Sequence, residues 1–328
     1  MLVTGANGAG KTNLLEALHV GTQGFSPRTR ADQQLVRVGA DAARVALDGE
    51  RGGRPVAVEV TLQHNAGKRA KLNGAPLRSA EQLRSELSTL VFTPDRLAVV
   101  KGGPAARRAY FDRTLGRLRP GRAALPVEYA AALGQRNAAL RRVQIGASTR
   151  DAVGPWTEQV AALGARLVEY RRDTLALLAP SFADRAAELG LAGAVLEYTG
   201  EPASAAALEA RLERDVERGV TGLGPHLDDI TIRSGERELR TFGSQGEQRL
   251  AVLSLLLAEA EVIEEQRGTP PLVLLDDVLS ELDASRRRIL AERIARVGQT
   301  VVTATGAEML PLEPAQLLEV TPGAVRVL

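Results

Sequence analysis

A short glycine-rich stretch near the start of the chain constrains its fold more than any other feature. It fits the pattern G-x-x-x-x-G-K-[ST] and reads Gly5-Ala6-Asn7-Gly8-Ala9-Gly10-Lys11-Thr12. An apolar stub, residues 1–4, precedes it, and a helical pattern follows over residues 11–22. In such a loop, backbone N–H groups turn toward phosphate oxygens, while Lys11 can reach the β and γ phosphates and Thr12 can ligate Mg²⁺. The stretch therefore predicts a nucleotide site within an α/β fold. The alternative is a chance glycine-rich turn.

A phosphate loop needs a carboxylate on the metal side, and a second apolar strand supplies one. Residues 272–275 are continuously apolar, which is typical of a central parallel strand, and Asp276 and Asp277 follow directly. We expect Asp276 to be the Mg²⁺ partner and Asp277 to orient or deprotonate the attacking water. The alternative is that the two carboxylates cap a helix or lie in a solvated turn.

Composition excludes several other classes of protein. The chain has no Cys and three His in 328 residues, which excludes a disulfide scaffold, cysteine catalysis and a histidine-rich metal site. No apolar run approaches the length of about 18 residues that a spanning helix needs, so we expect a soluble, cytoplasmic protein without membrane contact. Lys+Arg 42 against Asp+Glu 40 leaves a net charge of +2, so any affinity for nucleic acid depends on local clusters.

Patterning divides the chain into three stretches. Residues 43–47 and 56–62 alternate apolar and polar side chains around glycines, which predicts an antiparallel hairpin, and Asn73-Gly74 predicts a further turn. Residues 104–217 are rich in Ala, Leu, Arg and Glu, which predicts several helices. After residue 222 the pattern alternates again: a hairpin over 230–232 and 236–239, helices over about 246–266 and 284–297, and strands at 272–275 and 300–303.

A third motif lies before the Asp276 strand and indicates the class. It opens a helix and comprises Ser244, Gln245, Gly246, Glu247 and Gln248. An ordinary capping box between Ser244 and Glu247 is one interpretation. The segment also resembles the signature motif of ABC-type ATPases, which completes the ATP site of an opposing subunit, and the two interpretations are compatible because a capped helix N-terminus suits a γ-phosphate. The segment Ser280-Glu281-Leu282-Asp283 resembles the D-loop of the same superfamily.

Within that superfamily the whole chain resembles the RecF family of bacterial recombination mediators. The resemblance rests on Phe92-Thr93-Pro94-Asp95, Gly102-Gly103-Pro104 with Arg107-Arg108, Gly224-Pro225-His226 with Asp228-Asp229, and the three motifs above. It implies an ATPase head split in sequence (residues 1–103 and 218–328) around an inserted helical lobe (104–217). It also implies ATP contacts from Gly5 to Asn13, slow regulatory hydrolysis, an ATP-dependent homodimer, DNA binding at gaps or stalled forks, and work with RecO and RecR in loading recombinase.

The chain departs from the family pattern in three places. Family members usually carry a strand pair before the phosphate loop, so we expect either a misassigned start or a missing sheet edge. Leu227 stands where Arg is common, which puts a charge role there in doubt. Thr303 and its neighbours stand where transport ATPases have a switch His, so γ-phosphate sensing would fall to a Thr hydroxyl.

Several other residues have both a functional and a structural interpretation. The candidate DNA contacts are Lys68, Arg69, Lys71, Arg107 and Arg108, and the alternative for each is a solvated face of the protein. Contact with the backbone of duplex DNA is favoured over stacking on bases, because aromatics make up only 3% of the chain. We expect a structural role for His226, a solvated turn or cap at Asp228-Asp229, and helix packing for Trp156. The rival functions are an ATP-binding subunit of a transporter and a truncated, non-catalytic scaffold.

Overall fold

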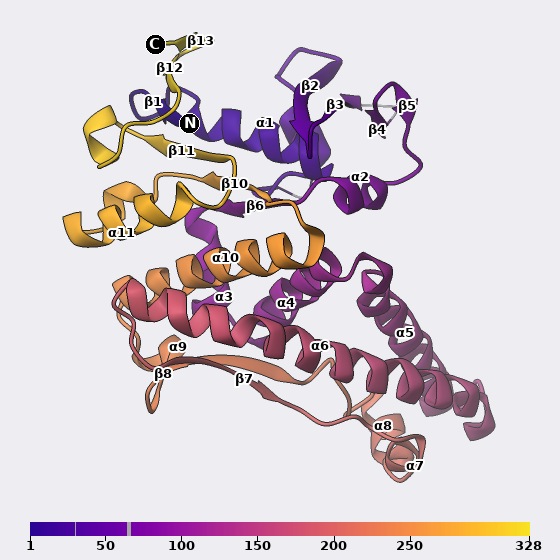
Figure 1. Cartoon of the computed structure of the whole chain (residues 1–328). Helices are drawn as coiled ribbons and strands as arrows, with labels where there is room; N and C mark the ends of the chain where they lie inside the picture. Colours follow the sequence, from indigo (N-terminus) through magenta and orange to yellow (C-terminus); the bar gives the residue numbers. More distant parts are fainter. Residues whose placement is uncertain (30, 64–66) are drawn as a thin grey trace. The chain divides into compact units, whose positions relative to one another are not determined.

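The computed structural model describes residues 1–29, 31–63 and 67–328 and divides into two compact units (Figure 1). Unit 1 comprises Met1–Arg96, Asp184–Leu191 and Val252–Leu328, and unit 2 comprises Leu97–Ala183 and Ala192–Ala251. Each unit is therefore assembled from segments that are distant in the sequence. The three-part division of the chain at residues 103 and 217 stays a prediction about its functional parts.

Unit 1 contains a six-stranded sheet in the order β13-β12-β1-β11-β10-β6. Its strands are β1 Leu2–Thr4, β6 Thr89–Phe92, β10 Leu272–Leu275, β11 Thr300–Ala304, β12 Leu317–Thr321 and β13 Ala324–Val327. All neighbours pair in parallel except β12 and β13. Because the carboxyl ends of parallel strands meet at one edge of a sheet, the loop after β1 and the carboxylates after β10 share that edge.

Helices cover this sheet and form a core with it. The helices that lie wholly within unit 1 are α1 Lys11–Gln23, α2 Ala80–Glu86 and α11 Ala284–Ile294. Helix α1 packs against β6 and β11. The core joins α1 to four strands through Leu15, Val3, Val91, Leu274 and Val301. Burial on both faces explains why β10 reads as a continuous apolar run in the sequence, and β11 is likewise buried along its whole length.

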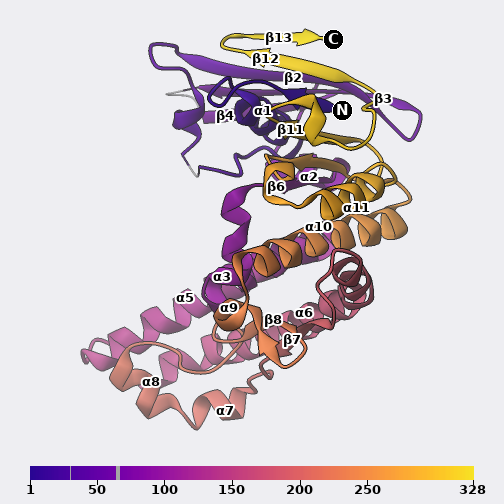
Figure 2. The ribbon, with the colours of Figure 1, turned by 90° about the vertical axis from the view of Figure 1, so that its left-hand side faces the viewer.

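A second sheet of unit 1 is antiparallel and has the order β2-β3-β4-β5. Its strands are β2 Ala42–Arg51, β3 Arg54–Gln63, β4 Gly67–Leu72 and β5 Ala75–Pro76. Strands β2 and β3 run side by side (Figure 2) and are joined by Gly52 and Gly53, whose φ angles of 55° and 77° give the left-handed turn that a tight hairpin requires. One face of the sheet is apolar and packs with Val20 of α1.

Unit 2 combines helices with a small antiparallel sheet in the order β7-β8-β9. Its strands are β7 Ala194–Thr199, β8 Asp229–Ser234 and β9 Arg237–Glu238, and its own helices are α3 Ala98–Lys101, α4 Pro104–Leu118, α5 Leu125–Gln144, α7 Ala205–Glu209, α8 Leu212–Arg218 and α9 Leu239–Phe242. Two longer helices, α6 Gly154–Glu188 and α10 Gln245–Arg267, contribute to both units. Trp156 packs against the buried cluster of Ala139, Leu140 and Val153, which confirms helix packing for its ring.

Most expected elements are confirmed, and the exceptions have physical reasons. The α/β class, the antiparallel sheet, the α1 helix and the strands β10 and β11 are as expected. Residues 194–199 were expected within a helical stretch, but they form β7, because their pairing with β8 lies more than thirty positions away and local composition does not record it. The expected strand over 236–239 ends at Glu238, and Leu239 begins α9 instead.

Candidate nucleotide-binding site

The loop after β1 approaches the neighbouring strand so closely that its first residue must be glycine. Gly5 has a φ of 154°, and a Cβ placed there would lie 2.3 Å from the carbonyl oxygen of Val320 on β12. Helix α1 then begins at Lys11, and the preceding residue, Gly10, has no side chain to cap it. The first N–H groups of a 13-residue helix therefore face the loop, where the helix dipole favours an anion.

Lys11 is folded back over this loop and is only 8% exposed. Its Nζ donates to the carbonyl oxygens of Gly5 at 2.7 Å and Ala6 at 3.0 Å. An ammonium group has three donors, so Lys11 can fix the loop and still donate to a phosphate oxygen. Contact of Lys11 with the β and γ phosphates stays a prediction, and the structure adds its loop-fixing contacts.

The Thr12 hydroxyl meets the carboxylate of Asp276, as the paired motifs predicted. Thr12 Oγ1 donates to Asp276 Oδ1 at 3.1 Å and Oδ2 at 3.0 Å. Asp276 itself is buried at the carboxyl end of β10. A hydroxyl and a carboxylate within contact of each other are hard oxygen donors of the kind that Mg²⁺ takes beside substrate phosphates, so this pair fits a magnesium ion.

Asp277 adopts an uncommon backbone conformation directly after this carboxylate. Its φ is 49°, which is the left-handed region, and its side chain is exposed. The Asp277 N–H donates to Thr303 Oγ1 at 2.9 Å, and Thr303 Oγ1 donates to Asp276 Oδ1 at 2.8 Å. The only hydrogen of the Thr303 hydroxyl is thus already used. The structure therefore argues against Thr303 as a direct γ-phosphate sensor.

The signature segment opens α10 with the expected capping box. The Ser244 N–H donates to Glu247 Oε2 at 2.8 Å, and the Glu247 N–H donates to Ser244 Oγ at 3.2 Å. The first of these bonds, with help from Arg237, lowers the pKa of Glu247. Ser244, Gln245 and Gly246 are exposed. A rigid, solvent-facing helix N-terminus results, which is the form that an anion from another molecule can approach.

Gln248 does not share this exposure. Its side chain is buried, and Nε2 donates to the carbonyl oxygen of Leu239 at 2.8 Å. The expected direct contact of Gln248 with a nucleotide of another subunit is therefore wrong for its side chain as it lies here. This bond fastens the start of α10 to α9, while Gln248 Oε1 is buried without a hydrogen-bond partner among the described residues.

The segment resembling a D-loop continues from Asp277 and ends at the next helix. Ser280 Oγ donates to the Asp277 carbonyl oxygen at 3.0 Å, which closes a 3₁₀ turn over Leu279–Glu281. Asp283 then caps α11 by accepting from the Arg286 N–H at 2.9 Å. The exposed Glu281 lies between these two fixed points.

One cation beside α1, Arg28, could not be singled out from the sequence. Arg28 Nη1 lies 3.3 Å from Glu16 Oε2 and 3.5 Å from Asn13 Oδ1, so it borders the first turns of α1. A chain with 42 Lys and Arg, nearly all of them Arg, gives no reason to single out one arginine. Only the return of residues 25–29 toward α1, fixed by Ser26 on Glu16, brings it there.

The basic residues of β4 do not form one patch. Side chains alternate along a strand, so Arg69 and Lys71 share one face, while Lys68 lies on the other face with Ala70 and Leu72. Lys68 Nζ pairs with Asp32 at 2.8 Å, and Lys71 Nζ lies 3.6 Å from Glu59. The expected three-residue cluster is therefore wrong, and Arg69 with Lys71 remain candidates for DNA contact.

Arg107 and Arg108, which are adjacent on α4, form contacts within unit 2. Arg107 is buried, and its Nε and Nη2 bind both Asp229 oxygens at 2.7 and 2.6 Å, so it is not a surface contact for DNA. Burial works to raise the pKa of Asp229, but Arg107 holds it below its usual range. Arg108 is half-buried and donates to the Asp228 carbonyl oxygen, and burial lowers its pKa.

The carboxylate of Asp228, the residue before Asp229, is also buried. The Tyr198 hydroxyl donates to Asp228 Oδ2, and the Asp228 side chain is buried. The expected solvated turn or cap at Asp228-Asp229 is therefore wrong. Both carboxylates anchor the loop that joins α8 to β8, because each takes a partner from a different element of unit 2.

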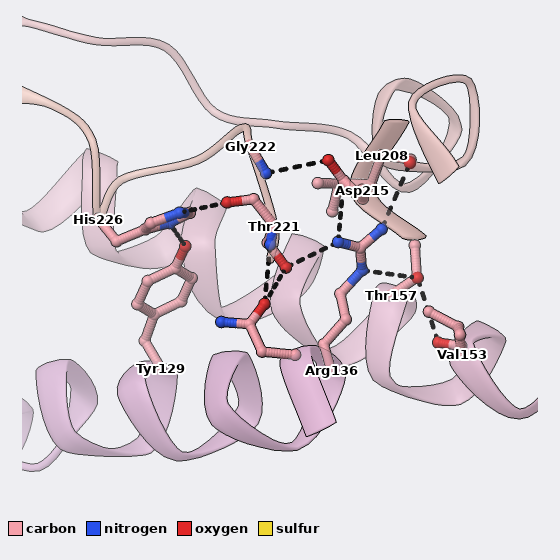
Figure 3. A network of polar contacts seen from close by, with 10 residues as sticks. Tyr129, Arg136, Val153, Thr157, Leu208, Asp215, Thr221, Gly222 and His226 are labelled. Atoms are coloured by element: carbon pink, nitrogen blue, oxygen red, sulfur yellow. Dashed lines mark hydrogen bonds and ion pairs between the residues drawn. The ribbon is translucent and has the colours of Figure 1, made fainter. Parts of the chain in front are cut away.

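His226 holds the same loop, as expected for a structural residue (Figure 3). Its Nε2 lies 3.0 Å from the Thr221 carbonyl oxygen and its Nδ1 lies 2.8 Å from the Tyr129 hydroxyl. A carbonyl only accepts, so the proton of the neutral ring lies on Nε2 and Nδ1 accepts from Tyr129. Burial lowers the pKa of His226, which favours this neutral form.

A fully buried ion pair continues the network (Figure 3). Arg136 Nη1 donates to Asp215 Oδ2 at 2.8 Å and to Thr221 Oγ1 at 2.7 Å, and Nε donates to Thr157 Oγ1 at 3.0 Å. Asp215 Oδ1 in turn accepts from the Gly222 N–H at 3.1 Å. Helices α5, α6 and α8 are thereby tied to the loop that carries His226.

Within residues 1–29, 31–63 and 67–328, no group of three or more His, Cys, Asp or Glu side chains could hold a metal ion. Within the same ranges, no helix has the length and apolar character needed to cross a membrane.

Known proteins show the same combination of fold and motifs. A family model described as the RecF/RecN/SMC N terminal domain matches residues 1–324. The chain is 40% identical over 338 residues to a DNA replication and repair protein RecF of Anaeromyxobacter dehalogenans (strain 2CP-C), covering 96% of this chain and 88% of that protein. It is 36% identical over 318 residues to a protein of the same name from Heliobacterium modesticaldum, covering 93% and 86%.

Solved structures agree with these relatives. A structure described as the recombination mediator protein RecF-ATP in the RecFOR pathway superposes with a TM-score of 0.88 and 28% identity, over all of this chain and 91% of that one. An Smc head bound to the C-winged helix domain of ScpA superposes with a TM-score of 0.57 and 17% identity, which is a likeness of fold alone.

Proposed function

The chain belongs to the RecF family of DNA replication and repair proteins, and from this premise we propose that it is an ATP-gated DNA-binding recombination mediator. It acts at gapped or stalled-fork DNA and helps to load recombinase onto single-stranded gaps. The observation that carries the ATP part is the contact of Thr12 with Asp276, because it joins the phosphate loop to a metal-side carboxylate. The relative solved as RecF-ATP supports the same ligand.

The nucleotide site follows from the loop geometry. ATP lies with its phosphates on the N–H groups of residues 5–13 and on Lys11, and Thr12 and Asp276 hold Mg²⁺. When bound, the magnesium ion neutralises charge on the β and γ phosphate oxygens. Asp277, exposed at the same edge of the sheet, is the candidate that orients or deprotonates the attacking water. Hydrolysis is proposed to be slow and regulatory, as the family resemblance implies.

The exposed signature segment is proposed to serve a second copy of the chain. Ser244, Gln245 and Gly246 present the N-terminus of a 23-residue helix to solvent, with Glu247 holding Ser244 in place. The γ-phosphate of a nucleotide bound to another copy is a suitable anion for that position. ATP then joins two copies, and hydrolysis releases them.

DNA contact is proposed to be directed at the phosphate backbone. The net charge of +2 and an aromatic content of 3% favour a few local cations over base stacking. Arg69 and Lys71 lie on one face of β4 and remain candidates, with half-buried Arg108 as a third. The proposed partners are RecR and RecO type mediators, and the proposed location is the cytoplasm.

The test is retention on gapped duplex DNA with and without ATP and Mg²⁺, at several salt concentrations. We expect log affinity to fall linearly with log salt, and ATP to slow dissociation. Arg69→Ala should reduce the salt slope by about 1, while Lys68→Ala, on the opposite face, serves as the matched control. Binding that ignores both salt and ATP would contradict the proposal. A chain that binds no ATP would favour the scaffold alternative, and co-purification with a membrane protein would favour the transporter subunit.

A further inference from the structure

Thr303 lies at the position of the sheet that joins the two halves of the nucleotide site. Strand β11 lies between β1, which leads into the phosphate loop, and β10, which leads into Asp276. Thr303 pairs with Val3 in register, one residue beyond the pair of Val302 with Leu275. Its side chain therefore stands at the carboxyl edge of the sheet, next to the point where Asp276 follows β10.

The Thr303 hydroxyl both donates and accepts a hydrogen bond. The residue is 0% exposed, and Oγ1 donates to Asp276 Oδ1 at 2.8 Å while accepting from the Asp277 N–H at 2.9 Å. Asp276 Oδ1 also accepts from Thr12. One buried hydroxyl thus links the metal-side carboxylate to the backbone of the next residue. Asp277 has a φ of 49°, a conformation that costs free energy in a residue other than glycine and persists only when its surroundings hold it.

We propose that Thr303 is a positioning residue for the nucleotide site. Its hydroxyl orients the Asp276 carboxylate toward Thr12 and holds the Asp277 backbone in the left-handed turn that presents the Asp277 side chain at the sheet edge. The effect on turnover rests on the ATPase activity proposed above. The backbone contact exists without nucleotide, so it can be measured separately.

Three variants separate this role from simple packing. Thr303→Val keeps the shape and removes the hydroxyl, and Thr303→Ser keeps the hydroxyl and removes a methyl group. Thr300→Val is the matched control, because Thr300 is buried on the same strand and its hydroxyl donates to the Ile294 carbonyl oxygen. Thermal unfolding of all three checks that each variant folds.

The expected result is a split between turnover and binding. Thr303→Val lowers kcat for ATP by about 10- to 100-fold, as is usual when a partner behind a metal-side ligand is removed, and changes ATP affinity much less. Thr303→Ser and Thr300→Val retain kcat near that of the wild type. Wild-type turnover in Thr303→Val, or a Thr303→Ser variant as slow as Thr303→Val, would overturn the proposal.

The second readout needs no activity. Hydrogen exchange at the Asp277 amide in the nucleotide-free protein should be faster in Thr303→Val than in the wild type and Thr303→Ser, because the amide loses its acceptor. Unchanged exchange would overturn the positioning role even if turnover fell. Absence of ATP turnover in the wild type would instead remove the proposed hydrolysis, and the exchange rates would still decide whether Thr303 holds this turn.

Discussion

Thr12 donates its hydroxyl hydrogen to the Asp276 carboxylate at 3.0 Å, although the two residues lie 264 positions apart in the sequence. The contact forms because the strands that precede them, β1 and β10, are parallel and are separated only by β11. It turns two short motifs into one site with a cation, a hydroxyl and a carboxylate at a single sheet edge. The predictions below test what that site does and what supports it.

Lys11→Ala should lower ATP affinity by about 10- to 100-fold, because a hydrogen bond to a charged group contributes about 1.5–3 kcal/mol. The loss of its bonds to Gly5 and Ala6 adds to the effect. Fluorescence titration with ATP measures it, with Lys101→Ala, at an exposed position of α3, as the matched control. Equal affinities in the two variants would refute the assignment of the phosphate loop.

Asp277→Asn should retain ATP and lose most of its turnover. Asn tolerates the left-handed conformation at φ 49°, so the turn survives while the charged group near the attacking water is removed. The expected product is an ATP-loaded dimer that does not separate. Phosphate release measures turnover, and Asp283→Asn is the control because Asn also caps a helix well. Undiminished turnover would direct attention to exposed Glu281.

Arg136→Met should destabilise the chain by about 3–5 kcal/mol, because it leaves the Asp215 carboxylate buried without its partner. Both side chains are almost completely inaccessible, at 0% and 1%. The double variant with Asp215→Leu should lose less than the sum of the single losses, and denaturant unfolding measures the difference. Arg150→Ala, which removes an exposed ion pair with Glu213, should change stability little. Additive losses at the buried pair would show that the two residues do not interact.

His226 should make stability depend on pH in a defined direction. Burial lowers its pKa below the usual value of about 6.5, so the unfolded chain binds the proton more readily than the folded chain. The stability from the neutral ring is therefore present above about pH 6.5 and is lost as pH falls through the lower folded pKa. Unfolding from about pH 7.5 to about pH 5 should show a steeper loss for the wild type than for His226→Gln. Parallel curves would contradict this.

Local patterns predicted the elements whose reason for forming is local. The alternation over β3, the apolar run of β10 and the loop before Lys11 each fix their own structure. Local patterns did not predict strand β7, because Ala194–Thr199 becomes a strand through pairing with β8. Strands β12 and β13, which complete one side of the β1 sheet, were not predicted for the same reason.

The site shows the same limit. Residue type and spacing predicted Lys11, Thr12, Asp276 and the Ser244 capping box, since each depends on a motif that folds as a unit. They did not predict that Arg107 is buried on Asp229 or that Gln248 turns inward, because a charged or amide side chain reads alike in sequence whether it meets solvent or a distant partner. They also placed Thr303 at the sheet edge but did not predict its bonds to Asp276 and Asp277.

The central claim is that ATP joins two copies through the exposed signature segment, and Ser244→Arg tests it most directly. The change alters the surface offered to another copy and leaves the phosphate loop of its own chain intact. Size-exclusion chromatography with light scattering, run with ATP and Mg²⁺ after ATP binding has been verified for each protein, measures the outcome. We predict that the wild type doubles in mass while Ser244→Arg binds ATP and stays a single copy. Dimerisation of Ser244→Arg with ATP to the same extent as the wild type would contradict the claim.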